Sequence, residues 1–266
     1  MGVISLSTLD LALAAALVGA LALAGWRLSL GIARPLVIAA LRTTVQLSLI
    51  GLVLTALFAR ATLPWVLALA IVMVLLAGRE VVARQKRRLT GGWSYLLGTT
   101  AMFISSFAVS GLALLVLINA EPWYLPQYAI PLLGMLLGNT MNGIALSLER
   151  LTDAAYRRRG EIEARLTLGE TWSAAIAPMR LESMRAGLIP IINSMAAAGI
   201  VSLPGMMTGQ ILSGTPPMEA VKYQILIMFL IAAGTGFGTM VAVWFGAKRL
   251  FDERERLRLD RLKTTN

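Results

Sequence analysis

Apolar residues gather in seven blocks along the chain, separated by short polar stretches. The blocks cover residues 6–25, 35–58, 62–78, 93–118, 128–148, 186–203 and 222–246. An α-helix of roughly 20 residues spans the hydrocarbon core of a bilayer, because each residue adds about 1.5 Å. The pattern therefore predicts an all-α integral membrane protein with seven transmembrane helices, which form a single domain over residues 1–266.

Composition agrees with this prediction. Only 14% of the 266 residues are charged, whereas a soluble domain carries about 25%. No Lys or Arg precedes Arg27, so the first block lacks the basic start of a signal peptide and is expected to be a retained helix. The chain has neither Cys nor His, which excludes disulfides, thiolate or imidazole metal ligands and the usual general base.

The basic residues predict the orientation of the helices. With the N-terminus outside, 21 of the 24 Lys and Arg residues fall on the inner side: near the 25–35 connection, in 79–88, in 149–185 and in the charged tail 247–266. This distribution follows the positive-inside rule and predicts an N-out, C-in topology. It also accounts for the net charge of +10, so the expected partner is membrane lipid and no nucleic acid.

The only sizeable polar insertion, residues 149–185, is expected to lie in the cytoplasm between the fifth and sixth spans. A short helix is predicted from Glu161 to Leu168, with a break at Gly169. A second, amphipathic helix follows, in which Trp172, Ile176 and Met179 share one face. One interpretation is a helix that lies on the membrane surface.

A second interpretation rests on spacing. Glu163-Ala164-Arg165, followed after three residues by Gly169, resembles the EAA-x-x-x-G loop of bacterial ABC-transporter permeases, although Arg165 stands where that loop has Ala. Over roughly 35–250, the segments "RTTVQLSLIGLVL", "LTLGETWSAA", "MRAGLIPIINS", "GIVSLPGMMTGQILSG" and "PMEAVKYQILIMF" resemble the FetB-type family of ABC permeases. That family includes bacterial proteins implicated in iron export and plant relatives linked to aluminium tolerance.

The resemblance implies the membrane subunit of an ABC exporter for iron or a related metal ion, in the bacterial inner membrane. It implies a FetA-like ATP-binding partner, with two copies of each chain. The residues expected to couple the chain to the ATPase are Glu163, Ala164, Gly169, Thr171, Trp172 and Pro178. The alternatives are a permease for a small organic or sugar-nucleotide cargo, and a non-transporting membrane regulator coupled to an ATPase.

The chain is not expected to be an enzyme. No Gly is followed by Lys, so the P-loop pattern G-x-x-x-x-G-K-[ST] is absent from the sequence. ATP and Mg²⁺ are therefore expected on the partner subunit, and no cofactor on this chain. A membrane enzyme would also need a nucleophile with a base, or a metal cage, within the spans.

Polar and flexible residues inside the spans are candidates for a translocation path or gate, because polar groups at membrane depth usually face a bundle interior or a cavity. They are Arg42, Gln46, Asn139, Asn142, Glu149, Asn193, Ser194, Pro204, Gly205, Met206, Met207 and Gln210. Arg42 either extends towards the headgroups or pairs with a carboxylate such as Glu149. The Asn residues either bond across to another helix or line the path. No metal ligands can be assigned.

The stretch 201–214 is expected to finish the sixth span near the outer mouth. Pro204 has no N–H, which leaves a carbonyl near Ile200 without its helical partner. The chain would then turn through 208–217 as a gate-like cap, unless this is an ordinary kinked helix end. G-x-x-x-G pairs at 134/138, 205/209 and 234/238 are candidate faces for close helix contact.

Overall fold

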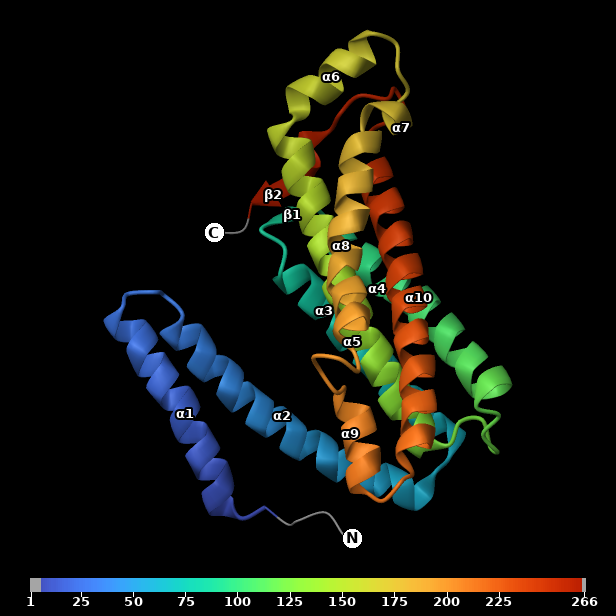
Figure 1. Ribbon diagram of the computed structural model, residues 1–266. Helices are drawn as coiled ribbons and strands as arrows, with labels where there is room; N and C mark the ends of the chain where they lie inside the picture. The colour runs from blue at the N-terminus through green and yellow to red at the C-terminus, as the bar shows by residue number, and fades with distance from the viewer. Residues whose placement is uncertain (1–5, 265–266) are drawn as a thin grey trace.

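The computed structural model describes residues 6–264 and is almost entirely helical (Figure 1). The helices are α1 (Thr8–Arg27), α2 (Ala33–Arg60), α3 (Leu63–Ala83), α4 (Trp93–Leu112), α5 (Pro126–Arg157), α6 (Arg159–Thr167), α7 (Trp172–Ala175), α8 (Ala177–Ala197), α9 (Gly205–Leu212) and α10 (Pro217–Arg249). A π-helical segment, η1 (Ala113–Leu117), extends α4. Near the C-terminus, the 3₁₀ segment η2 (Leu259–Arg261) leads into β2 (Leu262–Thr264), which pairs antiparallel with β1 (Arg87–Leu89).

Within residues 6–264, six helices are long and apolar enough to cross a membrane: α1, α2, α3, α4 with η1, α5 and α10. The predicted seventh, 186–203, is not among them. Its helix, α8, begins earlier and ends at Ala197, so the prediction of continuous helix as far as 203 is wrong. The physical reason is local: Gly199 adopts a left-handed conformation, with φ of +80°, which an α-helix cannot contain.

The segment predicted as the sixth span is instead interrupted. α8 ends at Ala197, a non-helical segment covers 198–204, and α9 then continues away from α8 towards the end of the molecule where α10 begins (Figure 1). Both α8 and α9 contact α10. Pro204 therefore does not kink the end of a helix, which was the alternative interpretation of the sequence; it is the N-cap residue of a new helix. The predicted turn through 208–217 is confined to residues 213–216, because 208–212 are helical.

Helices α3, α4, α5, α8 and α10 form a bundle in which small residues permit close approach. A Cβ on Gly187 of α8 would overlap Ser147 Oγ and would lie 2.6 Å from the carbonyl oxygen of Gly143, both on α5. A Cβ on Gly238 of α10 would lie 2.8 Å from Ser105 Oγ on α4. The prediction of close packing at 234/238 is thus confirmed. In the described part of the chain, by contrast, no neighbouring element comes within 4 Å of a Cβ built on Gly138, Gly205 or Gly209.

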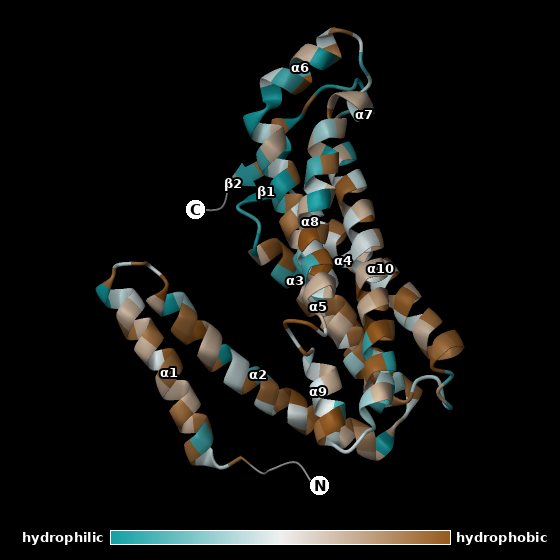
Figure 2. Cartoon of the chain, viewed as in Figure 1, coloured by the Kyte–Doolittle hydropathy of each residue, from teal (hydrophilic) through white to brown (hydrophobic). Residues whose placement is uncertain are grey.

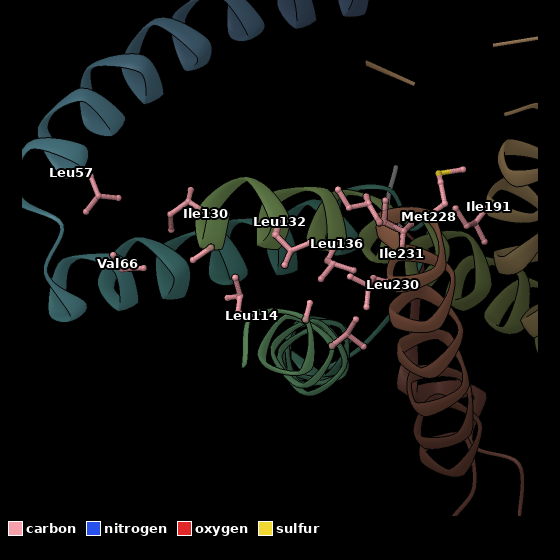
Figure 3. Close-up of a cluster of buried hydrophobic side chains, with 14 residues drawn as sticks. Leu57, Val66, Leu114, Ile130, Leu132, Leu136, Ile191, Met228, Leu230 and Ile231 are labelled. Atoms are coloured by element: carbon pink, nitrogen blue, oxygen red, sulfur yellow. The ribbon is translucent and has the colours of Figure 1, made fainter. Parts of the chain in front are cut away.

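Helices α1 and α2 form an antiparallel pair that leans away from this bundle, and we call residues 8–60 the α1–α2 arm (Figure 1). The C-terminal end of α2 joins the arm to the bundle through Leu57, which is buried in a cluster with Val66 of α3 and Ile130 and Leu132 of α5 (Figure 3). Within α2, all of which the structure describes, only Leu57 is buried. Most of the arm's apolar surface is therefore left for lipid or another chain.

Polar and apolar residues separate along the long axis of the bundle (Figure 2). α5 has 32 residues and α10 has 33, so each is about 50 Å long, whereas a bilayer core is about 30 Å thick. Both helices project beyond the apolar zone at the end that carries α6 and α7, where hydrophilic residues predominate (Figure 2). This end is the region that the basic residues assign to the cytoplasm.

The C-terminal tail folds back on this polar end. The Arg258 amide donates to the Leu250 carbonyl at 2.7 Å, and the Thr90 amide donates to the Arg261 carbonyl at 2.8 Å. The first bond folds the tail back onto the end of α10, while the second bond and the β1–β2 pairing tie residues 250–264, which we call the tail clasp, to the connection between α3 and α4.

Candidate functional site

The helical hairpin made of α6, the turn at 168–171 and α7 protrudes from the polar end of the bundle (Figure 1). We call residues 159–175 the platform. Gly169 has φ of +88°, a conformation that a non-glycine residue adopts only with strain, and it allows the chain to reverse between the two helices. The predicted helix to Leu168 and its break at Gly169 are therefore confirmed as local structure.

The platform is fixed to the bundle by an apolar underside. Ile162, Ile176 and Met179 are completely buried in a cluster that includes Leu151 of α5 and Val243 of α10. The face predicted for Trp172, Ile176 and Met179 does point inward, with Trp172 partly buried and the other two fully buried. The single helix predicted to carry it is divided, because Trp172 lies in α7, Met179 lies in α8 and Ile176 lies between the two helices. Because close-packed interiors are stiff, a displacement of the platform would move α5, α8 and α10 with it.

Aromatic and charged side chains strengthen this attachment. The Trp172 ring lies 5.9 Å from Trp244 and 5.7 Å from Phe251, measured between centroids. The Arg180 guanidinium stacks over Trp244 at 4.4 Å and donates to the Ser173 carbonyl at 3.1 Å. Trp244 is on α10 and Arg180 on α8, so these contacts join the two helices at the base of the platform.

The tail clasp also reaches the platform. Glu255 accepts a hydrogen bond from the Trp172 amide at 3.0 Å, and a cavity of about 460 Å³ lies between Gly169, Glu170 and residues 254–256. Asp252 organises the clasp: the Arg256 amide and side chain and the Arg254 amide all donate to its carboxylate, which lowers its pKa to about 2. The sequence offered no sign of this arrangement, because a highly charged tail is usually solvated.

Ion pairs hold α6 at its start. Arg158, between α5 and α6, donates to Glu161 at 2.9 and 3.0 Å and to Glu182 of α8 at 3.0 Å. The hydrogen bonds from Arg158 lower the pKa of Glu161. Exposed ion pairs contribute little stability individually, so their main effect is to set the angle at which α6 leaves α5.

The predicted coupling residues occupy different parts of the platform. Glu163, Ala164, Gly169 and Thr171 are exposed, whereas Trp172 and Pro178 are partly buried at its base. Thr171 caps α7, because its side chain accepts a hydrogen bond from the Ala174 amide. Leu168 was missing from the predicted set, yet its exposed fraction is 84% and it forms an apolar tip between Thr167 and Gly169. The sequence signal that could have identified Leu168 is its position as an apolar residue next to a helix-breaking glycine.

A second polar region lies between α2 and α3. Arg42 makes an ion pair with Glu80 of α3, and both residues line a cavity of about 820 Å³ together with Gln46, Arg79 and Arg84. The suggested pairing of Arg42 with Glu149 is wrong. α3 continues past the predicted end of its apolar block at 78, which places Glu80 within reach of Arg42.

Glu149 has a different role: its carboxylate accepts a hydrogen bond from the Lys86 amide at 2.7 Å. Asn142, on the same exposed side of α5, accepts a hydrogen bond from Arg84. Asn139 instead donates to the Met135 carbonyl within its own helix, at 2.8 Å. The structure thus brings Asn142 and Glu149 to the junction of α3 and α5, while Asn139 contacts no other helix through this bond.

The remaining path candidates lie around the break between α8 and α9. Asn193 and Ser194 are exposed on the last turns of α8, and Gly205 is exposed at the first turn of α9. Met207 is buried, while Met206 packs against the cluster of Figure 3. The Gln210 side-chain oxygen is buried, and the described part of the chain offers it no hydrogen-bond donor.

The break itself exposes an apolar loop. The exposed fractions of Ile200 and Val201 are 88% and 83%. The Ser202 amide donates to the Ala197 carbonyl, and the Gly199 amide donates to the Ser202 carbonyl, so the loop is a compact turn. Since α9 has eight residues, the loop lies about 12 Å from the α9–α10 turn.

Residues 6–264 contain no group of three or more Asp and Glu side chains placed to hold a metal ion. The polar regions of the described chain are instead arginine-rich, as in the α2–α3 cavity.

Six apolar helices, an exposed apolar arm and a polar end that projects beyond the apolar zone define a multi-pass α-helical membrane protein. The chain belongs to the family described as "Uncharacterised protein family (UPF0014)", whose model matches residues 8–251. This match confirms the resemblance on which the sequence-based interpretation relied.

Three relatives illustrate the family. The chain is 41% identical to "UPF0014 membrane protein slr1647" of Synechocystis over 244 residues, which cover 90% of this chain and 91% of the relative. It is 35% identical to "Probable iron export permease protein FetB" of Escherichia coli, over 60% of this chain and 64% of the relative. It is 30% identical to "UPF0014 membrane protein STAR2" of rice, over 81% and 73%. No solved structure matches the chain significantly.

Proposed function

We propose that this chain is the membrane subunit of an ABC exporter in the bacterial inner membrane, moved by a separate FetA-like ATP-binding subunit. The observation that carries the proposal is the platform: an exposed hairpin with a fully buried underside on α5, α8 and α10. Such a hairpin can transmit a rigid-body displacement, which a solvated loop cannot. The FetB relative, whose printed name is that of an iron export permease, supports the assignment to transport.

The break between α8 and α9 is the proposed gate. Non-helical backbone at membrane depth is tolerated where it is covered by protein or lines a water-filled cavity. In many transporters the ends of interrupted helices lie at the substrate pathway. α8 leads directly from the platform to this break, so movement of the platform reaches Asn193 and Ser194 through one helix, and Pro204 lies at the far side of the loop that follows.

Two copies of the chain are expected with two ATPase subunits, because ATP is hydrolysed between paired ATPase subunits. The exposed faces of α8, α9 and the arm provide apolar surface for contact between the copies. Asn139 and Asn142 then belong to the proposed path, while Gln46 and the Arg42–Glu80 pair lie in the α2–α3 cavity that joins the arm to α3.

The coupling role is tested by association with the ATPase subunit. Glu163→Arg combined with Gly169→Pro reverses the charge of the exposed helix face and removes the left-handed turn. We expect co-purification to fall by about tenfold or more, because a few central residues usually dominate an interface. Glu253→Arg, an exposed charge reversal on the tail clasp, is the matched control and should leave association unchanged. Undiminished association of the double variant would contradict the coupling role.

The cargo is tested separately, with the chain and its ATPase reconstituted in proteoliposomes. Iron or a related metal ion is the proposed cargo, by analogy with FetB. ATPase stimulation is compared for Fe(II), Fe(III), Al(III), Cu(I) and small organic or sugar-nucleotide compounds. If no metal ion stimulated the ATPase and an organic compound did, the cargo would be that organic compound and the metal assignment would be wrong. Normal ATPase docking with no transport of any compound would favour a regulator.

A further inference from the structure

Two cavities follow one another along the crevice between α2 and α3. The first, of about 820 Å³, is lined by Arg42, Gln46, Arg79, Glu80 and Arg84. The second, of about 700 Å³, lies further along α2 towards its C-terminus, and its lining is mostly apolar, including Val53, Trp65 and Val72, with Arg60 as its one charged residue.

The lining positions show that both cavities lie on one face of the helix pair. On α2 they include residues 39, 46, 53 and 60, and on α3 they include 65, 72 and 79, in steps of seven. Residues seven apart lie on the same side of a helix, because seven residues make almost two turns. The crevice therefore has a charged end and a mostly apolar end, and both lie on the same face of the helix pair.

The charged end has excess positive charge. It contains three guanidinium groups and one carboxylate, Glu80, which is engaged by Arg42. Arg84 donates to the neutral side chain of Asn142, and among the described residues Arg79 has no acidic partner within ion-pair distance. Guanidinium groups bind phosphate oxygens with paired, charge-assisted hydrogen bonds, whereas a bare metal cation would be repelled.

The length of the crevice limits what can occupy it. Arg42 and Leu57, one at each end, are 15 residues apart on α2, which corresponds to about 22 Å. Half of a bilayer core is about 15 Å thick, and a headgroup adds several more. A molecule with an anionic head and a tail of one leaflet's length fits both ends at once.

We infer that the crevice between α2 and α3 binds one anionic phospholipid. Its phosphate lies at Arg79 and Arg84, and an acyl chain extends along the apolar cavity towards Trp65. The lipid belongs to the leaflet on the platform side, because α3 leads from Arg84 directly to β1 and the tail clasp. Bound there, it fills the gap between the arm and α3. The inference does not depend on the cargo or on the ATPase partner.

The test uses the full-length protein, purified in detergent and supplied with either phosphatidylglycerol or phosphatidylcholine of equal chain length. Native mass spectrometry counts retained lipids, and thermal unfolding reports their effect. We expect wild type to retain phosphatidylglycerol and to be stabilised by it. The double variant Arg79→Gln, Arg84→Gln should lower the retention of phosphatidylglycerol, relative to that of phosphatidylcholine, by about tenfold. Each basic residue near an anionic lipid contributes substantially to the binding free energy.

The matched control is Arg27→Gln with Arg34→Gln, which removes the same charge from exposed positions at the α1–α2 turn. It should keep the lipid preference of wild type. Ala68→Phe narrows the apolar cavity and should reduce retention of the lipid, with the arginines intact.

Three results would overturn the inference. Equal retention of both lipids by wild type would remove the headgroup selectivity. A loss in the control as large as in the Arg79/Arg84 variant would show only general surface attraction. Stabilisation by inorganic phosphate or glycerol phosphate as strong as that by the lipid would indicate a site for a soluble phosphate compound.

Discussion

Where α8 crosses α5, Gly187 leaves no room for a side chain. The Gly143 carbonyl lies 2.6 Å from where a Cβ would be, and this backbone atom cannot rotate away as the Ser147 hydroxyl could. None of the three G-x-x-x-G pairs in the sequence includes this contact, because Gly143 and Gly187 are 44 residues apart and share no local pattern.

We predict that Gly187→Ala destabilises the protein by about 1–3 kcal/mol, the usual effect of adding atoms to a packed core. Gly138→Ala, also in a membrane helix but with open space around its Cβ, should be neutral or slightly stabilising because Ala favours helix. Thermal unfolding in one detergent compares the two variants. Equal melting temperatures would contradict the close crossing of α5 and α8.

At the scale of elements, the interrupted helix is the main departure from the sequence-based expectation. Hydropathy marks 186–203 as apolar, and it carries no information on whether an apolar segment is continuous. Gly199 and Pro204 were visible, but only the structure shows that they delimit a loop between two helices. The platform was easier to predict, since Gly169 and the spacing of Trp172, Ile176 and Met179 are local signals.

We predict that Pro204→Ala reduces transport and leaves ATPase docking intact. Proline fixes φ at the start of α9, so its loss makes the ordered form of the loop less favourable relative to disordered forms, by about 0.4–1 kcal/mol. Pro216→Ala is the matched control, because Pro216 is the N-cap residue of α10 outside the loop. Transport in proteoliposomes and co-purification with the ATPase give the two readouts. Lost docking in Pro204→Ala would mean that the proline acts structurally.

At the scale of the whole molecule, the tail clasp joins segments that are far apart in the sequence. It links the α3–α4 connection, the platform and the end of α10 through Thr90, Trp172 and Arg258. A displacement of the platform therefore has a route to α3 and α4 as well as to α5, α8 and α10.

We predict that Asp252→Ala loosens the clasp and that Asp252→Asn has a smaller effect, because Asn keeps an acceptor for the Arg254 and Arg256 amides. The pKa of Asp252 is lowered to about 2, so its stabilising effect is complete above about pH 4, the range of a free carboxyl group. The effect is lost as the pH falls through about 2. Hydrogen exchange at Thr90 and Arg258, corrected for intrinsic rates, measures the loosening.

Wild type should show constant protection of these amides between about pH 5 and 8, where the Asp252 carboxylate stays ionised. Glu253→Gln, a neighbouring exposed residue, serves as the control and should match wild type. Unchanged protection in Asp252→Ala would show that the β1–β2 pairing alone holds the tail.

The membrane location, the helical class and the helix–turn–helix of the platform follow from hydropathy, helical spacing and single glycines, which act over a few residues. The family follows from the resemblance of five segments between 35 and 250. The pairing of Arg42 with Glu80, the separation of α8 from α9 and the binding of the tail to the platform become visible only in the folded chain. These contacts join residues distant along the chain, and they depend on how the helices pack, which no local pattern specifies.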